Sequence, residues 1–356
     1  MDLENLEKVL QAEPKYRLKQ ANEAVFKNFI SDWSEATFFT KELRDKLNKE
    51  CPLKIEADLL ISEKEDSIKA KITLKDGFKI ESVLMRHSDG RNTVCVSCQV
   101  GCPLGCLFCA TGKMGFKRNL TTNEIVEQAI FFNRYLKKIG PSDRSREGLF
   151  HGVTNVTFMG MGEPFLNYDN VWGAVKIFND YKYFNIGVRS ISISTAGIIE
   201  GIKKLSEGLS REAGSRHAGH VNLAISLHAP NDKLRRELMP IDKKYPLQDV
   251  LKAVDEYIKE TNRKVMFEYV LIKGVNDSDN NAKELAKIMD RKLYFVNLIL
   301  YNKTPQTGQA GSFEPSDTKR VQAFRAILEK LKIRYTQRYR FGDDIQAACG
   351  QFATSK

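Results

Sequence analysis

The chain has 356 residues, of which 42% are hydrophobic and 28% charged, and its formal net charge is +11. This length can bury a sizeable core, and the basic charge favours a polyanionic partner, RNA or DNA before an anionic membrane surface. The acidic, amphipathic N-terminus is not typical of a secretory signal, and no apolar run approaches the ~20 residues of a membrane span. We therefore expect a cytoplasmic protein that does not enter a membrane.

The pattern of residues divides the chain into three predicted domains. Residues 1–52 place apolar residues at helical spacing, with lysines and arginines between them, which indicates a small helical module, either purely structural or RNA-binding. Residues 53–91 alternate polar and apolar residues on both sides of Asp76-Gly77, which predicts a β-hairpin. Residues 92–356 then repeat strand and helix patterns, as an α/β domain does.

The α/β segment contains enough strand patterns for six βα units. Thr121 and Glu124 fit a capping box at the start of its first long helix. Six units favour a partial (βα)6 barrel over a closed eightfold one, and a doubly wound sheet is the competing architecture. Two polar, glycine-bearing insertions, 140–148 and 210–217, are predicted surface loops. The strand candidates are 93–98, 153–158, 189–194, 221–227, 265–272 and 294–300, followed by 333–341.

Three cysteines, Cys102, Cys106 and Cys109, are spaced C-x3-C-x2-C within one short loop. Thiolates are soft donors that suit zinc or iron–sulfur clusters. Structural zinc takes four protein ligands, whereas three cysteines can hold a [4Fe-4S] cluster and leave one iron open to a small molecule. The spacing therefore favours a [4Fe-4S] cluster; a disulfide or a zinc site completed by a distant histidine are the alternatives.

Polar and glycine residues gather where the predicted strands end. In βα barrels the C-terminal ends of the strands form the active site. Glycines let a ligand approach the backbone, a carboxylate accepts from an ammonium group, and hydroxyl, imidazole and amide groups suit a carboxylate and a ribose. Beside a cluster, this set predicts a pocket for S-adenosyl-L-methionine. The residues are Gly160, Gly162, Glu163, Ser194, Ser226, His228 and Asn302.

Six long motifs lie at 95–102, 109–112, 116–120, 160–164, 226–229 and 347–351. Through them the chain resembles the radical-SAM RNA adenine methyltransferases, from about Pro14 onward. The resemblance implies a partial barrel with an N-terminal RNA-binding module. It also implies methylation of carbon 2 of an adenine in the peptidyl-transferase region of 23S rRNA, and of an adenine beside the tRNA anticodon. Such an enzyme would act as a monomer that receives electrons from a flavodoxin-like protein.

The resemblance also implies a role for each matching residue. Cys349 would be methylated by a first S-adenosyl-L-methionine, and a radical made from a second would remove hydrogen from that methyl group. Cys95 would resolve the covalent RNA adduct by forming a disulfide with Cys349, and Glu81 would accept a proton. Cys102, Cys106 and Cys109 would hold the cluster. The cosubstrate contacts would be Gly162, Glu163, Ser194, Ser226, Leu227, His228 and Asn302.

The chain departs from the family pattern at a few positions. Cys98 replaces the usual serine, and Lys303 replaces the usual proline after Asn302. The turn between the second hairpin strand and Cys95 is one residue longer than usual, as in relatives that methylate carbon 8, whereas Val100 and Pro164 favour carbon 2. The alternatives are therefore carbon-8 methylation of the same rRNA adenine and a non-catalytic RNA-binding protein with a zinc loop.

Overall fold

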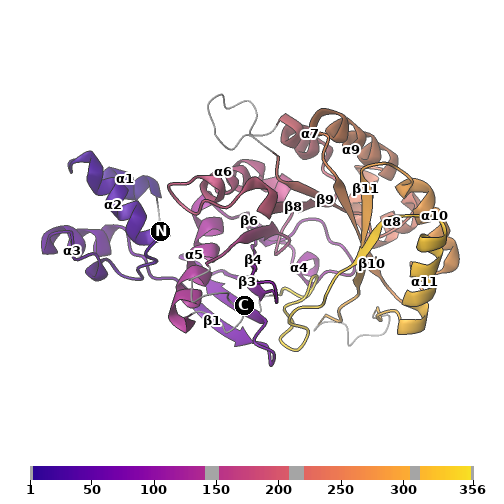
Figure 1. Cartoon of the computed structure of the whole chain (residues 1–356), viewed down its shortest axis with the longest axis horizontal. Coiled ribbons are helices and arrows are strands. Elements are labelled where there is room, and N and C mark those ends of the chain that lie inside the picture. Colours follow the sequence, from indigo (N-terminus) through magenta and orange to yellow (C-terminus); the bar gives the residue numbers. More distant parts are fainter. Residues whose placement is uncertain (1–2, 141–151, 208–219, 305–312, 354–356) are drawn as a thin grey trace.

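The computed structural model describes residues 3–140, 152–207, 220–304 and 313–353. A group of short helices lies at one end of the molecule, and a strongly curved sheet wrapped by helices forms the rest (Figure 1). The two insertions predicted as surface loops lie outside the described residues, except for Gly140. In the described ranges, no helix has the length and apolar character needed to cross a membrane.

The N-terminal module contains the predicted short helices. Trp33 fills its centre, fully buried, and its Nε1 donates a hydrogen bond of 2.8 Å to the carbonyl of Cys51. The module rests on the barrel, where the Phe26 ring meets Tyr183 edge-on at 4.9 Å between centroids. Its elements are α1 (Leu3–Val9), α2 (Lys15–Phe26), η1 (Trp33–Glu35) and α3 (Lys41–Glu50).

An antiparallel extension connects this module to the barrel. Strands β1 (Glu56–Ile61), β2 (Ser67–Thr73) and β3 (Lys79–Arg86) pair as a meander, and β3 pairs antiparallel with β4 (Asn92–Cys95). The turn between β2 and β3 contains Gly77 at φ +82°, a conformation that favours glycine. The hairpin predicted around Asp76-Gly77 is therefore confirmed.

The barrel sheet continues from β4 as parallel strands in sequential order, β4-β7-β8-β9-β10-β11-β12. A sequential order carries every crossover in the same direction, so the helices collect on one face and the sheet curls. A doubly wound sheet would reverse direction and cover both faces, which excludes that alternative. The strands are β7 (Asn155–Phe158), β8 (Ile191–Thr195), β9 (Asn222–Ser226), β10 (Val265–Leu271), β11 (Tyr294–Leu300) and β12 (Tyr335–Gln337).

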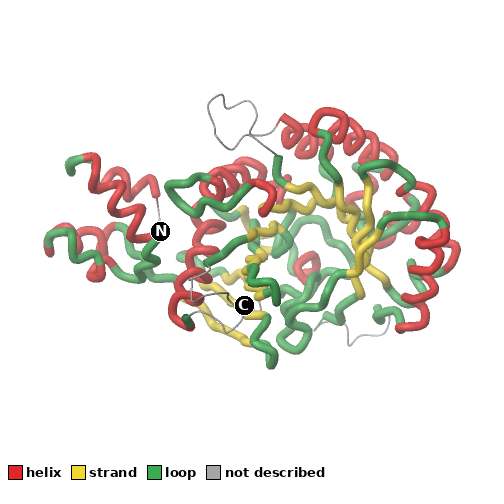
Figure 2. Tube along the Cα trace, viewed as in Figure 1, coloured by secondary structure: helices red, strands yellow, loops and turns green. Residues whose placement is uncertain are grey.

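Helices surround the outside of the barrel, with the strands inside (Figure 2). The capping box at Thr121 and Glu124 opens the long helix α5 as predicted. The helices are α5 (Thr122–Ile139), α6 (Tyr168–Asn179), α7 (Ile199–Glu207), α8 (Asp232–Leu238), α9 (Leu247–Thr261), α10 (Asp279–Met289) and α11 (Thr318–Lys330), with 3-10 turns η3 (Pro164–Asn167), η4 (Val188–Ser190) and η6 (Pro240–Lys243).

Two predicted strands are shorter than expected. The strand predicted over 93–98 ends at Cys95, because the backbone N–H groups of Cys98 and Gln99 turn away to donate to the carbonyl of Met161. The strand predicted over 333–341 is limited to β12, and its last ladder bond runs from the Arg338 N–H to the carbonyl of Leu298.

The chain after β12 crosses from the last barrel strand to the antiparallel extension. The N–H of Glu63 donates to the Asp344 carboxylate at 2.8 Å, and the N–H of Ala353 donates to the Glu81 carboxylate at 3.1 Å. On the way, the carbonyl of Gly350 accepts from the N–H of Ala110 at 2.8 Å. This path places Cys349 next to the cysteine loop.

Candidate active site

The cysteine loop lies between two short paired strands, β5 (Gln99–Gly101) and β6 (Phe116–Asn119), and leads into α4 (Ala110–Lys113). Gly101 has φ +73°, and a Cβ placed there would lie 1.8 Å from the carbonyl oxygen of Gly115, so only glycine fits. The thiols of Cys102, Cys106 and Cys109 line one cavity of about 160 Å³ at the C-terminal ends of the barrel strands. The predicted convergence of loop and strand ends is therefore present.

The donor set suits an iron–sulfur cluster in the type and number of its ligands. Burial raises the pKa of the Cys102 thiol to about 12, and burial with the neighbouring Cys109 raises that of Cys106 well above its usual value. Without a positive centre both stay protonated, whereas metal ions deprotonate ligating thiols outright. In the described ranges no three His, Cys, Asp or Glu side chains lie at the spacing of ligands to one metal ion. The three thiols therefore line the same cavity without lying at ligand distances from a common centre.

His228 lies in the same cavity but does not complete a Cys3His zinc site. Its Nδ1 accepts a hydrogen bond of 3.1 Å from the N–H of Val270, so the proton of the neutral ring is on Nε2. Burial, together with Arg235, lowers the pKa of His228 to about 3. The Nε2 atom therefore offers an N–H donor to the cavity and not a lone pair. This donor suits an oxygen atom of a ligand, and a zinc ion would need the lone pair.

Glu163 lies in the loop after β7, at the N-cap of η3, and is only 3% exposed. Its two carboxylate oxygens accept from the N–H of Phe165 at 2.9 Å and the N–H of Ala196 at 2.8 Å. Burial nevertheless raises its pKa to about 7. The preceding Gly162 has φ +102°, and a Cβ there would lie 2.6 Å from the Cβ of Gln99. A nearby ammonium group would favour the ionised carboxylate.

Changing Glu163 to Gln should remove a pH dependence of stability. Because folding raises this pKa from 4.5 to about 7, the folded state holds the proton more tightly, so stability is greatest below 4.5 and falls as the pH rises towards 7. The loss for the parent should be about 3 kcal/mol between ~pH 4 and ~pH 8. Urea unfolding of the iron-free protein at both pH values measures it; an equal loss in Glu163→Gln would contradict the assignment.

The serine and asparagine residues predicted for the cosubstrate also line the cavity. The Ser194 hydroxyl donates to the Glu268 carboxylate at 2.9 Å and lies 3.4 Å from the Ser226 hydroxyl. Asn302 donates from Nδ2 to the carbonyl of Cys349 at 3.3 Å. Its buried Oδ1 accepts no hydrogen bond from any described residue. Such an orphaned acceptor suits a hydroxyl or amino group of a ligand.

Cys349 and Cys95 meet at the edge of the same site. Cys349 lines the main cavity, and with Cys95 it lines a neighbouring hollow of about 30 Å³. Both are free thiols. Burial raises the pKa of Cys95 to about 12 and also raises that of Cys349, where Arg338 opposes the shift. Cys98, by contrast, is buried outside both cavities, with its thiol 3.6 Å from the carbonyl of Met161.

Two predicted residues lie outside the cavity lining. The buried Glu81 carboxylate pairs with Lys69 at 3.0 Å, and burial raises its pKa against the effect of that lysine. The bond from Ala353 links its carboxylate to the C-terminal segment, and its carbonyl accepts from the Ser97 hydroxyl at 2.6 Å. The Leu227 side chain is packed in the main core, and its N–H donates to the carbonyl of Glu268 at 3.0 Å. Any ligand contact of Leu227 would therefore use its backbone.

Sequence reasoning missed two charged residues at the site, Glu268 and Arg338. Glu268 lies in the middle of β10 and accepts from Ser194, while Arg338 approaches its other oxygen at 3.4 Å. The Cys349 thiol is the largest influence that raises the pKa of Arg338, so the guanidinium lies close to it. A single glutamate inside the apolar run VMFEYVL was a usable signal, because an unpaired carboxylate is rarely buried.

A partial barrel with a three-cysteine loop at its C-terminal mouth defines a radical SAM enzyme, and the model of the radical SAM superfamily matches residues 142–286. The probable dual-specificity RNA methyltransferase RlmN of Dictyoglomus thermophilum is 41% identical over 352 residues, 98% of this chain and 94% of the relative. The ribosomal RNA large subunit methyltransferase N of Nitrosopumilus maritimus is 39% identical over 350 residues, 96% and 93% of the two chains.

A solved structure supports the same placement. The crystal structure of a radical SAM methyltransferase from Sphaerobacter thermophilus is 40% identical, covers 99% of this chain and 97% of its own, and superposes with a TM-score of 0.88. The chain belongs to the radical SAM RNA methyltransferase family of these dual-specificity enzymes. The predicted fold, enzyme class and family resemblance are thereby confirmed.

Proposed function

We propose that this enzyme methylates carbon 2 of an adenine in 23S rRNA, and of an adenine beside the tRNA anticodon, with S-adenosyl-L-methionine as the methyl source. The observation that carries the proposal is the position of Cys349, which lines the cavity shared by Cys102, Cys106 and Cys109. The names of the relatives, a dual-specificity RNA methyltransferase and a large-subunit rRNA methyltransferase, support the two RNA substrates. The basic net charge of +11 suits both.

In this proposal Cys102, Cys106 and Cys109 hold a [4Fe-4S] cluster. With S-adenosyl-L-methionine, such a cluster supplies the one-electron chemistry that an electron-poor aromatic C–H requires. The ionised Glu163 accepts from the methionyl ammonium group, and its two backbone bonds keep the carboxylate in place. The orphaned Oδ1 of Asn302 and the Nε2–H of His228 orient the polar parts of the cosubstrate.

Cys349 carries the methyl group as a thioether and then holds the RNA covalently in this proposal. Cys95 releases the product by forming a disulfide with Cys349, since both thiols line the same small hollow. Arg338 favours the thiolate form of Cys349, because its guanidinium opposes the pKa rise that burial causes. Glu81 is assigned the proton-accepting role. Its buried carboxylate pairs with Lys69 and accepts a hydrogen bond from Ala353 of the C-terminal segment.

We further propose that residues 1–52 form an RNA-binding module, residues 53–91 a connecting extension and residues 92–356 the catalytic barrel. Changing Lys15 and Lys19, both exposed on α2, to Ala should weaken RNA binding and lower the salt dependence by up to about one unit of slope for each lost phosphate contact. Filter binding at several salt concentrations measures both. The same change at the exposed Lys252 and Lys259 of α9 is the matched control; equal effects in the two pairs would disprove a special role of the module.

Nucleoside mass analysis of rRNA and tRNA, from cells with and without this protein, tests the reaction. We expect 2-methyladenosine to appear in both RNAs only with the protein. An 8-methyladenosine product would overturn the choice of carbon 2. A colourless preparation from anaerobic purification, with stoichiometric zinc and no methylated RNA, would instead indicate the non-catalytic alternative.

A further inference from the structure

A second, larger cavity of about 820 Å³ lies at the opposite mouth of the barrel, where the parallel strands begin. Its wall includes Thr93 of β4, Asn155 of β7 and Ser192 of β8, together with the turn after β3 and the chain after β12. Among the described residues, Met159 alone lines both this cavity and the one that contains the cysteines. The volume falls in the range of small-molecule sites.

The lining of this cavity carries an excess of positive charge. Lys64, Arg86, Arg91 and Arg338 contribute four cations against two acids, Asp66 and Asp89. Asp89 pairs with Arg91 at 2.9 Å, and Asp66 accepts from the Ser67 hydroxyl at 2.9 Å. Arg338 in turn pairs with Glu268 at 3.4 Å, so the excess positive charge comes from Lys64 and Arg86. Burial, then Arg91, lowers the pKa of His87, so this ring adds no charge near neutral pH. The balance favours an anionic ligand.

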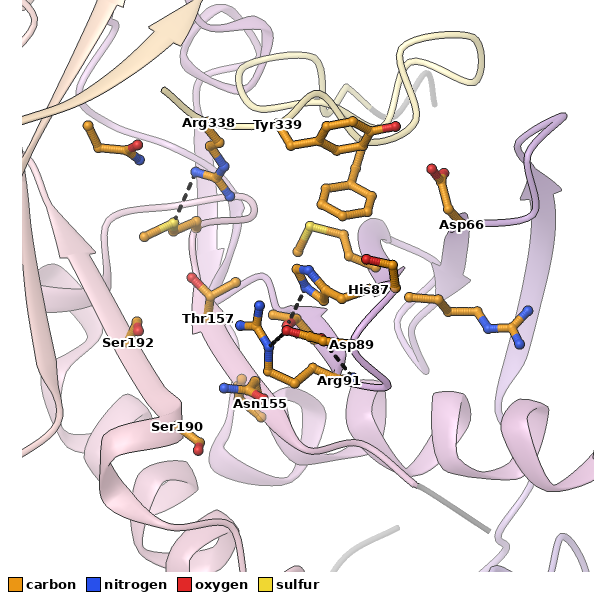
Figure 3. A pocket seen from close by; sticks show the side chains of 18 of the residues that line it. Asp66, His87, Asp89, Arg91, Asn155, Thr157, Ser190, Ser192, Arg338 and Tyr339 are labelled. Carbon is orange, nitrogen blue, oxygen red and sulfur yellow. Dashed lines mark hydrogen bonds and ion pairs between the residues drawn. The ribbon is translucent and has the colours of Figure 1, made fainter. Parts of the chain in front are cut away.

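An unsatisfied hydroxyl points to a ligand independently of this charge. Thr157 lies on β7, is 6% exposed, and its Oγ1 has no hydrogen-bond partner among the described residues. Figure 3 shows Thr157 between Arg338 and Arg91, with Ser190 at the end of η4 and Ser192 on the neighbouring strand β8. A buried hydroxyl without a partner is unfavourable, and a valine of the same shape would avoid this cost. A bound hydroxyl or phosphate group would satisfy it.

Aromatic side chains complete the rim. Tyr339 is 57% exposed, and its ring lies edge-on to Phe341 at 4.8 Å, while Phe341 in turn meets the His87 ring at 4.9 Å. Exposed aromatic faces are sites on which nucleobases stack. Guanidinium groups match the geometry of phosphate, and hydroxyls match that of a ribose.

We propose that this cavity is a nucleotide site, in which Arg86 and Arg91 contact the phosphate, Thr157, Ser190 and Ser192 the ribose, and Tyr339 the base. The assignment is separate from the methyl-transfer reaction and does not depend on it. The same chemistry is offered by a free nucleoside monophosphate and by one nucleotide of an RNA chain. Arg338 pairs with Glu268 at the catalytic site and also lines this cavity. Through Arg338, a nucleotide bound in this cavity would affect the surroundings of Cys349.

Isothermal titration of the full-length, cluster-loaded protein tests the proposal, with S-adenosylhomocysteine present to fill the catalytic cavity. The probes are adenosine 5′-monophosphate and a single-stranded RNA trinucleotide. Thr157→Val should weaken binding about fivefold, as loss of one hydrogen bond does, and Arg91→Ala by a similar or larger factor. Lys252→Ala removes a cation from the exposed face of α9, outside both cavities, and is the matched control, expected to bind like the parent.

The two probes separate the two sources of the ligand. Binding of the monophosphate, weakened in Thr157→Val and Arg91→Ala, supports a free nucleotide; binding of the trinucleotide alone, weakened in the same variants, supports an RNA nucleotide. Thr157→Val should unfold at or above the parent temperature, and if it unfolds earlier, Arg91→Ala decides the result. Binding of neither probe, binding that neither Thr157→Val nor Arg91→Ala weakens, or equal weakening by Lys252→Ala would overturn the proposal.

Discussion

Changing Cys95 to Ala should leave RNA attached to the protein. If Cys349 holds the adenine through a methylene bridge, removal of the neighbouring thiol removes the group that can release it, since Cys95 and Cys349 line one small hollow. We expect product release to fall by several orders of magnitude, while a protein–RNA adduct accumulates to about one per enzyme. Denaturing gel electrophoresis with labelled RNA measures the adduct.

A matched cysteine change separates this effect from a general loss of thiols. Cys51 is also buried, but it lies beside Trp33 in the N-terminal module, far along the chain from the cavity. Cys51→Ala should turn over like the parent and form no adduct. Parent-like turnover in Cys95→Ala would mean that the disulfide step has to be abandoned.

Changing Arg235 to Leu should have the largest effect on stability. Arg235 and Asp242 form an ion pair of 2.8 Å with both side chains fully buried, and Arg235 also donates to the carbonyls of Tyr245 and Ala196. Removing the cation leaves the buried carboxylate with its longer contact to the half-exposed Arg236, at 3.6 Å, and losing the buried partner costs about 3–5 kcal/mol. Urea unfolding measures the loss, and the substitution should also weaken cosubstrate binding.

The second effect follows from the contacts of Ala196. Its carbonyl accepts from Arg235 at 2.6 Å, and its N–H donates to Glu163 at 2.8 Å, so the arginine holds the segment that positions the carboxylate. The control is Arg291→Leu, which breaks a half-exposed pair with Asp255 and should cost less than about 1 kcal/mol. A similar small cost in Arg235→Leu would show that the buried pair does not stabilise the fold.

The local parts of the structure could be predicted from sequence. The hairpin around Gly77, the helix cap at Thr121 and the strand pattern depend on residues that are close in the chain, and the structure confirms them. The three cysteines also fall in one loop, so their common cavity follows from their spacing. The other family motifs indicated which strand ends lie beside these cysteines.

The non-local parts could not be predicted. Arg338 and Glu268 meet because β12 joins the sheet beside β11, a pairing that no periodicity encodes. The pair formed by Glu81 and Lys69 depends on the register of β2 against β3, and their link to the site depends on the path of the C-terminal segment. The early end of β4 depends on the carbonyl of Met161, which comes from a loop far along the chain.

The central claim is that Cys349 receives a methyl group beside the cofactor held by the three cysteines, before RNA is bound. Peptide mass spectrometry tests it directly, after the reconstituted protein has been incubated under reducing, anaerobic conditions with S-adenosyl-L-methionine carrying a deuterated methyl group. We predict one labelled methyl group on the peptide that contains Cys349 and none on the Cys95 or Cys98 peptide. An unmodified Cys349 in a preparation that methylates RNA would contradict the account.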